Sequence, residues 1–184
     1  IISTTVQLKL QHPDAQVLTP HVSKKMPDSA ILLNEVLQEK LNPLVEGRAN
    51  ISVDRYALRE KDPIIFTRNN YDLGVFNGTT GKVESISLES GKRLAKIKLE
   101  HTDETIDLNE NDLFDTGAEL AYAISVHKSQ GSEYEKVIFC CASNSPLVER
   151  SLVYTGITRA KKLCILVGTQ LSYSRAVKAL PRAD

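Results

Sequence analysis

The segment Val126–Glu133, with the sequence VHKSQGSE, carries residue types that bind phosphate groups and sugars. Gly131 lets backbone N–H groups come close to an anion, and the lysine, serine and glutamine side chains around it are hydrogen-bond donors. Glu133 supplies a carboxylate that can accept from ribose hydroxyls. The segment follows an apolar run, and the carboxyl end of a buried strand is where α/β proteins bind ligands. It therefore predicts a nucleotide or nucleic-acid loop, with a polar surface turn as the alternative for this segment alone.

A second polar segment, Thr155–Lys162, has the sequence TGITRAKK. If it is helical, Ile157 and Ala160 face the sheet while Arg159 points elsewhere. A guanidinium at the edge of such a helix offers a rigid fork for a γ-phosphate, as an arginine finger does in phosphoryl transfer. An isolated arginine is most often a solvated surface charge, so this interpretation depends on the neighbouring segments.

The bulk composition is that of an ordinary globular protein, since 41% of the 184 residues are hydrophobic and 25% are charged. No apolar run approaches the roughly 20 residues that span a membrane, so no membrane partner is expected. The 23 basic and 23 acidic side chains give zero net charge, so any nucleic-acid contact must come from local patches. Cys140, Cys141 and Cys164 lie in apolar runs and are expected to be reduced and packed, which suits a cytoplasmic location.

Helical and strand patterns alternate at both ends of the chain. Expected strands cover residues 15–19, 120–126, 137–141 and 163–168, and expected helices cover residues 29–41, 149–161 and a stretch from residue 171. The spacing of the last two strands fits a right-handed crossover and hence a parallel sheet. The sequence predicts an α/β domain made of residues 1–59 and 116–184.

Residues 60–115 differ in character from both flanks. Short β-branched or alternating runs at 63–67, 81–88, 94–99 and 104–108 are separated by Gly and Asn turns, which predicts a small β-barrel inserted in the α/β domain. Phe76 is expected to lie in the core of this barrel, with a base-stacking role as the alternative.

Four blocks of the chain resemble characteristic segments of superfamily 1 DNA helicases, in the order of that family. Residues 121–133 look like motif V, and residues 152–161 look like motif VI. Residues 16–20, followed by 33–43, resemble the segment around motif IV. Residues 67–78, TRNNYDLGVFNG, are similar to the start of the inserted barrel in RecD-like helicases, the group that includes the exodeoxyribonuclease V alpha subunit. Together these blocks cover most of the chain.

The resemblance implies a fold and a role for individual residues. The fold is the second RecA-like motor domain of a P-loop NTPase, without the P-loop itself, carrying the inserted barrel. Arg159 would be the catalytic arginine finger, and Gln130, Gly131 and Glu133 would bind ATP with it. Lys24 and Lys25 are both candidates for a second phosphate contact. The residues implied to contact DNA are Thr19, His21, Arg68, Tyr71, Asn77, Ser125, His127 and Ser129.

The sequence contains no G-x-x-x-x-G-K-[ST] phosphate loop and no acidic pair suited to Mg²⁺ at the end of an apolar strand. The resemblance assigns these parts to a first RecA-like domain, expected to precede Ile1 in a longer protein. ATP and Mg²⁺ would be held mainly there, and no metal site is expected in this segment. The segment alone is therefore expected not to hydrolyse ATP. The implied partners are single-stranded DNA, that first motor domain and the subunits of a nuclease–helicase complex.

The favoured interpretation is the C-terminal motor segment of an ATP-dependent DNA helicase that moves 5′ to 3′, the direction being implied by the RecD-like resemblance alone. One alternative is a non-catalytic nucleic-acid-binding module in which Arg159 contacts only phosphates. Another is the helicase part of a conjugative relaxase, which would carry a nicking domain upstream.

Overall fold

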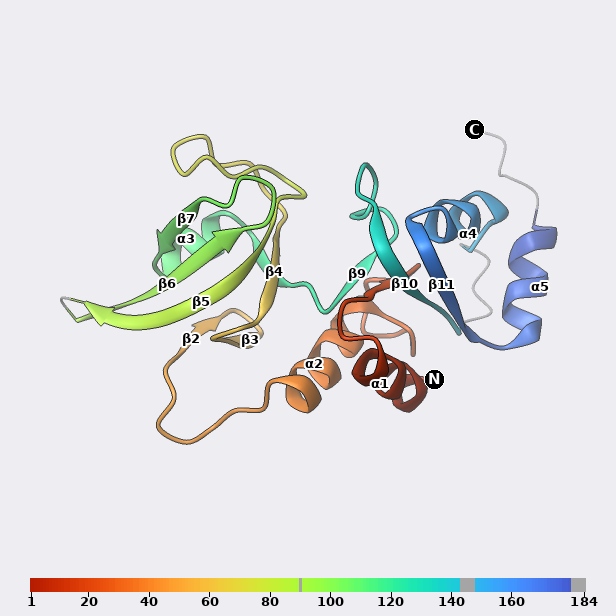
Figure 1. The fold of residues 1–184 in the computed structure, drawn as a ribbon, viewed down its shortest axis with the longest axis horizontal. Helices are drawn as coiled ribbons and strands as arrows, with labels where there is room; N and C mark the ends of the chain where they lie inside the picture. Colours follow the sequence, from red (N-terminus) through yellow and green to blue (C-terminus); the bar gives the residue numbers. More distant parts are fainter. Residues whose placement is uncertain (90, 143–147, 180–184) are drawn as a thin grey trace. The chain divides into compact units, whose positions relative to one another are not determined.

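A computed structural model describes residues 1–89, 91–142 and 148–179 and divides the chain into two compact units. The first unit consists of residues 1–37 and 123–184, and the second of residues 38–122. Helices flank a parallel sheet in the first unit, whereas the second unit is built from antiparallel strands (Figure 1). The second unit is longer than the insertion expected at 60–115, because residues from 38 onward bond within it.

Over the described residues, the sheet of the first unit has four parallel strands. In spatial order they are β11 (Ala160–Gly168), β10 (Tyr134–Cys141), β1 (Gln16–Thr19) and β9 (Ala123–Ser125). All three strand pairs are parallel, so their carboxyl ends lie at one edge of the sheet. Val17, Leu18 and residues 137–141 are fully buried in its centre. The α/β fold with a parallel sheet, expected from the apolar runs, is confirmed.

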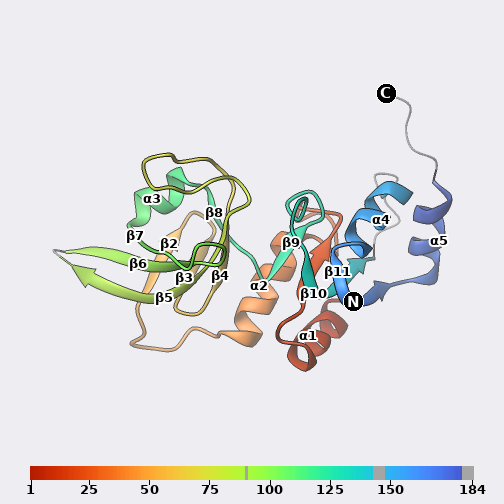
Figure 2. The same cartoon turned by 45° about the horizontal axis from the view of Figure 1, so that its top comes forward.

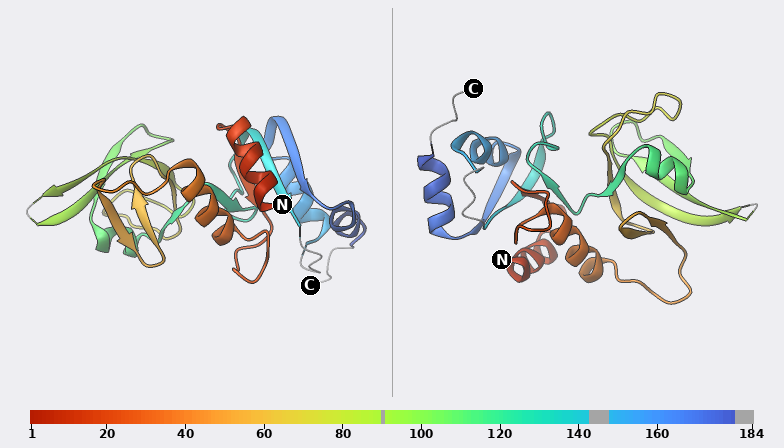
Figure 3. Two further views of the ribbon diagram at one scale, coloured as in Figure 1. Left: turned by 90° about the horizontal axis from the view of Figure 1, so that it is seen from below. Right: turned by 180° about the vertical axis from the view of Figure 1, so that it is seen from behind.

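Four of the described helices accompany this sheet. They are α1 (Ile2–Gln11), α2 (Ala30–Leu41), α4 (Arg150–Ile157) and α5 (Gln170–Lys178). Thr5 of α1 contacts Cys140, whereas Gly156 of α4 lies against the ring of Phe139. Neighbouring side chains on a strand point to opposite faces, so α1 and α4 cover opposite faces of the sheet (Figure 3). Among the described helices, none has the length and apolarity to cross a membrane.

The helix expected over 149–161 is shorter in the structure. It ends at Ile157, and β11 begins at Ala160, which pairs with Tyr134 of β10. Parallel pairing with a buried strand overrides the helix preference of the Ala-Lys-Lys sequence. Arg159 consequently lies in the turn between α4 and β11 and not on the helix.

The second unit contains a five-stranded antiparallel sheet in the order β7-β6-β5-β4-β8 (Figure 2). Its strands are β4 (Pro63–Phe66), β5 (Thr80–Glu89), β6 (Lys92–Leu99), β7 (Thr105–Leu108) and β8 (Ala118–Leu120). A hairpin of β2 (Asn50–Val53) and β3 (Tyr56–Arg59) and the short helix α3 (Glu110–Asp115) were not predicted. A closed barrel is not confirmed, because the described pairings leave β7 and β8 as sheet edges.

A buried carboxylate, Asp62, organises the start of the sheet in the second unit. Its oxygens accept hydrogen bonds from Gln38 Nε2 at 2.6 Å, Asn42 Nδ2 at 2.7 Å, the Tyr122 hydroxyl at 2.7 Å and the Arg59 backbone N–H at 2.8 Å. Burial raises the pKa of Asp62 above its ordinary value, against the opposing effect of these bonds. The cluster explains why the end of α2 belongs to the second unit.

Lys61 adopts a left-handed backbone conformation, with φ of 73°, in the turn before β4. Its N–H donates to the Val83 carbonyl at 2.7 Å, which holds this conformation in place. This conformation destabilises the folded state by about 1–2 kcal/mol when the residue is not glycine. A glycine at this position avoids that strain but lowers stability by about 0.5–1 kcal/mol, because it raises the conformational entropy of the unfolded chain. Lys61→Gly is therefore expected to stabilise the protein by about 0.5–1 kcal/mol in urea unfolding.

Asp54 provides the matched control, because its φ is 43° and aspartate tolerates this region better than lysine. Asp54→Gly should stabilise less than Lys61→Gly. A Lys61→Gly protein that unfolds at the same or lower urea concentration than the wild type would show that the turn is not strained.

Candidate functional site

The loop that follows β9 is held in shape by its own serines. The Ser129 hydroxyl donates to the Val126 carbonyl at 2.7 Å, and the Ser129 N–H donates to the Ser125 carbonyl at 3.1 Å. Ser125 Oγ accepts from the Lys128 N–H at 3.3 Å. Gly131 has φ of 84°, and a side chain built there would meet no atom within 4 Å. The turn at Gly131 is therefore open to a ligand on that side.

The guanidinium of Arg159 lies against this same loop. Its Nη1 donates to the Ser132 carbonyl at 3.2 Å, and its Nε donates to the Thr155 carbonyl at 3.2 Å. The Arg159 carbonyl in turn accepts from the Tyr134 N–H at 2.8 Å, where β10 begins. Among the described residues, no group accepts a hydrogen bond from Nη2, so the charged fork is positioned with one nitrogen available.

Two lysine–glutamate pairs flank the arginine at the start of β10 and β11. Lys161 lies 3.3 Å from Glu133, and Lys162 lies 2.6 Å from Glu135. The hydrogen bond from Lys162 lowers the pKa of Glu135, and the same bond raises the pKa of Lys162. The nearby carboxylates are thus engaged by lysines. Within the described part of the chain, Arg159 has no carboxylate partner.

The loop after β1 is tied to two neighbouring strand ends. The Thr19 hydroxyl donates to the Asp28 carbonyl, and the Thr19 carbonyl accepts from the Val126 N–H at 2.9 Å. The buried carboxylate of Asp28 accepts from the Ala142 N–H at 2.7 Å, just after β10. Three strand ends therefore share one hydrogen-bonded edge. Of the two lysines in this loop, Lys24 forms an ion pair with Glu35.

Arg159 is half-buried, and the other residues expected to bind ATP or DNA in the first unit fall into two groups. Side chains that line the loops from inside are buried: Thr19, His21, Ser125 and Ser129. Residues that reach the surface are exposed: His127, Gln130, Gly131 and Glu133. The hydroxyls of Thr19, Ser125 and Ser129 form hydrogen bonds within these loops. The direct DNA contacts expected of the four buried side chains stay predictions.

In the second unit, the three expected DNA contacts, Arg68, Tyr71 and Asn77, are all exposed. Tyr71 is 78% exposed and meets Phe76 edge to face, with 5.8 Å between ring centres. Phe76 is itself 48% exposed, so the expectation that it lies in the core is wrong. Asn77 N–H bonds the Asn69 side chain at 2.8 Å, which folds the loop so that both rings face solvent.

Arg68 stacks over another exposed ring. Its guanidinium carbon is 5.7 Å from the centre of the Phe114 ring, which is 58% exposed. This pair could not be predicted from local sequence, because the two residues belong to segments far apart along the chain. The bond from Arg159 to the Ser132 carbonyl could not be predicted either, since every residue type has a backbone carbonyl.

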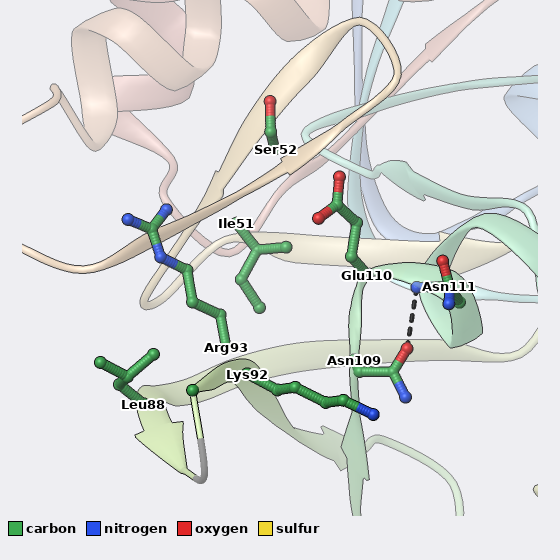
Figure 4. Close-up of a pocket in the computed structure, with 9 residues that line it drawn as sticks. Ile51, Ser52, Leu88, Lys92, Arg93, Asn109, Glu110 and Asn111 are labelled. Atoms are coloured by element: carbon green, nitrogen blue, oxygen red, sulfur yellow. Dashed lines mark hydrogen bonds between the residues drawn. The ribbon is translucent and has the colours of Figure 1, made fainter.

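A pocket of about 450 Å³ also lies in the second unit (Figure 4). Its charged lining groups are Lys92, Arg93 and Glu110, and Arg93 donates to the Asn50 carbonyl at 2.7 Å. None of the expected site residues lines it. The part of the chain that the structure describes has no group of three His, Cys, Asp or Glu side chains suited to a metal ion.

Two family models match the chain. The model described as "ATP-dependent RecD-like DNA helicase SH3 domain" matches residues 33–98, and "UvrD-like helicase C-terminal domain" matches residues 120–167. The ATP-dependent RecD2 DNA helicase of Deinococcus radiodurans is 33% identical over 167 residues, which is 88% of this chain and 21% of that protein. The RecBCD enzyme subunit RecD of Buchnera aphidicola is 28% identical over 151 residues, covering 79% of this chain and 23% of that protein. The chain thus spans about a fifth of these relatives.

Solved structures with a similar fold include two Pif1 helicases. The Bacteroides protein, in complex with ADP-AlF3 and single-stranded DNA, aligns with a TM-score of 0.56 at 16% identity, over 92% of this chain and 43% of that one. The Candida albicans protein aligns with a TM-score of 0.57 at 16% identity, over 86% of this chain and 46% of that one. At this identity the likeness concerns the fold.

Proposed function

Because the chain belongs to the RecD-like superfamily 1 DNA helicases, we propose that it is the second motor domain of an ATP-dependent DNA helicase, with the SH3-like module inserted. In the intact protein it would complete an ATPase site whose phosphate loop and Mg²⁺ belong to a first motor domain. The observation that carries this proposal is the position of Arg159 against the turn at Gly131, with Nη2 available.

The residues at this turn fit a nucleotide phosphate. Hydrogen-bond donors of the kind that bind phosphate oxygens meet at this turn. They are the available Nη2 of Arg159, the backbone N–H groups of the open turn at Gly131 and the exposed side-chain amide of Gln130. Arg159 would stabilise the negative charge that develops as the terminal phosphoryl group leaves. Glu133 would accept from the ribose, for which its carboxylate must leave Lys161. The roles of Arg159, Gly131 and Gln130 are supported by the available Nη2, the open turn and the exposed amide, respectively.

Single-stranded DNA would be held by exposed groups of both units. His127, in the loop after β9, would contact the DNA, and the buried hydroxyls of Ser125 and Ser129 would set the shape of that loop. Thr19 and His21 would do the same for the loop after β1. In the second unit, Arg68, Tyr71 and Asn77 would contact DNA from their exposed loop. Movement 5′ to 3′ and assembly with nuclease subunits are proposed from the RecD-like relatives alone.

Tyr71→Ala is expected to weaken binding of single-stranded DNA about 5- to 150-fold, because stacking on one aromatic ring contributes about 1–3 kcal/mol per base. Fluorescence anisotropy with a labelled oligothymidine at fixed salt measures the affinity. The control is Tyr154→Ala, which removes a similarly exposed ring in the first unit, outside the proposed DNA contacts. Equal losses in both variants would contradict a specific role for Tyr71.

The proposal as a whole is tested on a longer parent protein that includes this chain. ATP hydrolysis should rise on addition of single-stranded DNA, and a duplex with a 5′ single-stranded tail should be unwound in preference to one with a 3′ tail. DNA binding without DNA-stimulated ATP hydrolysis would favour the binding module instead. A DNA-nicking activity in the same parent would favour the conjugative relaxase.

A further inference from the structure

The side chain of Asn34, on α2, pairs with the backbone of β9 as a neighbouring strand would. Its Nδ2 donates to the Ala123 carbonyl at 2.7 Å, and its Oδ1 accepts from the Ala123 N–H at 2.9 Å. Two residues that face each other in an antiparallel pair exchange the same two bonds. Asn34 is 9% exposed and Ala123 is 1% exposed, so the pairing is shielded from water.

This amide sits where the sheet would otherwise be open. In the described pairings, β9 is the edge strand of the parallel sheet and pairs only with β1. A buried strand edge without partners is costly, because unpaired backbone groups lose their bonds to water. Asn34 bonds both the N–H and the carbonyl of Ala123 and so prevents β9 from sliding along its own direction.

The strand leads directly into the candidate site. Ser125, two residues after Ala123, accepts from the N–H groups of Lys128 and Ser129, and the loop then runs through Gly131 to the Ser132 carbonyl that holds Arg159. Any shift of β9 is therefore passed to the turn at Gly131. No comparable bond fixes this strand from another helix among the described residues.

We propose that Asn34 is a positioning residue that sets the loop of residues 125–133 in the geometry needed for nucleotide and DNA contact. The inference rests on the proposed function for its consequence, but the structural step is independent of it. A small displacement of a catalytic constellation can lower turnover about 100-fold without loss of folding. Asn34 is buried and bonds the backbone of β9, so its proposed effect on the loop runs through this strand.

The structural step is tested by amide hydrogen exchange on the 184-residue chain. In Asn34→Ala, the N–H groups of Ala123 and Ser129 should exchange at least about tenfold faster, while Ile138 in the centre of the sheet stays protected. Unchanged exchange at Ala123 and Ser129, or equal acceleration at Ile138, would overturn the positioning role. The first result would mean no fixation, and the second would mean general destabilisation.

The functional step is tested in the parent protein with Asn34→Asp, whose carboxylate repels the Ala123 carbonyl that the amide bonded. Turnover of the DNA-stimulated ATPase is expected to fall about 10- to 100-fold, with the KM for ATP changed less than about threefold. Asn111→Asp, the same change at an exposed site in the second unit, should keep full activity. Asn34→Ala serves as the readout if the aspartate variant does not fold.

The outcomes separate the two proposals. Normal turnover in Asn34→Ala, in a parent whose wild type hydrolyses ATP, overturns the positioning role and leaves the helicase proposal standing. A wild-type parent without DNA-stimulated ATPase overturns the helicase proposal, while accelerated exchange at Ala123 and Ser129 would still support the fixation of the loop by Asn34.

Discussion

Replacing Arg159 by alanine, in a parent protein with both motor domains, is expected to lower the turnover number of the DNA-stimulated ATPase about a thousandfold or more. The guanidinium has no carboxylate partner in the described part of the chain and lies beside the open turn at Gly131. Its proposed task is to stabilise charge that exists only in the transition state, so its loss should affect turnover far more than ATP binding. Steady-state ATPase assays with saturating single-stranded DNA measure the effect.

Two further variants sharpen this experiment. Arg159→Lys keeps the charge but loses the planar fork, and it should recover little activity. Arg150→Ala removes an exposed arginine at the start of α4 whose side chain bonds the Val177 carbonyl, and it should keep near-normal turnover. DNA affinity should change less than about threefold in Arg159→Ala, because the DNA contacts proposed above are made by other residues. Normal ATP turnover in Arg159→Ala would remove this residue from the mechanism.

Asp62→Ala is expected to destabilise the chain by about 3 kcal/mol, the largest stability effect anticipated for a single polar residue here. Asp62 is fully buried and accepts four hydrogen bonds. The amides of Gln38 and Asn42 keep second acceptors, the carbonyls of Ala57 and Glu60. The Tyr122 hydroxyl and the Arg59 N–H lose a buried acceptor, which accounts for most of the expected cost. Urea unfolding followed by circular dichroism measures it.

Matched controls separate the cluster from a general effect of charge removal. Tyr122→Phe removes one bond to Asp62 and should cost about 1 kcal/mol, whereas Asp72→Ala changes an exposed aspartate and should cost less than about 0.5 kcal/mol. Equal stability of Asp62→Ala and Asp72→Ala would contradict the account of the cluster.

The pH dependence of the same pair of proteins gives an independent check. Because burial raises the pKa of Asp62 in the folded state, the folded protein binds this proton more tightly than the unfolded chain. The contribution of Asp62 is therefore fully present below the unfolded pKa of about 4 and decreases as the pH rises through the folded pKa. The difference in unfolding free energy between wild type and Asp62→Ala should therefore become smaller as the pH rises from about 4 through the folded-state pKa of Asp62.

Much of the fold could be predicted from periodicity. The alternating runs at 63–67, 81–88, 94–99 and 104–108 became β4 to β7, and the apolar runs at 15–19 and 137–141 became the central parallel strands. Local pattern was sufficient for these because each strand buries its own apolar residues. The hairpin at β2 and β3 was missed, because its alternation over four residues a strand is too short to distinguish from a loop.

The site was predictable in its residue types but not in its contacts. Arg159 and Gly131 stood out because arginine and glycine have special chemistry, and the structure brings them to one turn through the Ser132 carbonyl. The hydrogen bonds of Asn34 to Ala123 and of Tyr122 to Asp62 could not be foreseen, since the two residues of each pair are 89 and 60 positions apart, respectively. A signal in the sequence was the spacing of four residues between Asn34, Gln38 and Asn42, which places polar groups along one side of α2 and directly after its end.

The most direct measurement is a structure of the parent protein with single-stranded DNA, Mg²⁺ and ADP–aluminium fluoride, a mimic of phosphoryl transfer. We expect a guanidinium nitrogen of Arg159 to lie within about 3.2 Å of a fluorine atom, with the Gly131 turn beside the nucleotide. Arg159 still bonded to the Ser132 and Thr155 carbonyls, more than about 6 Å from the fluoride, would contradict its assignment as the arginine finger.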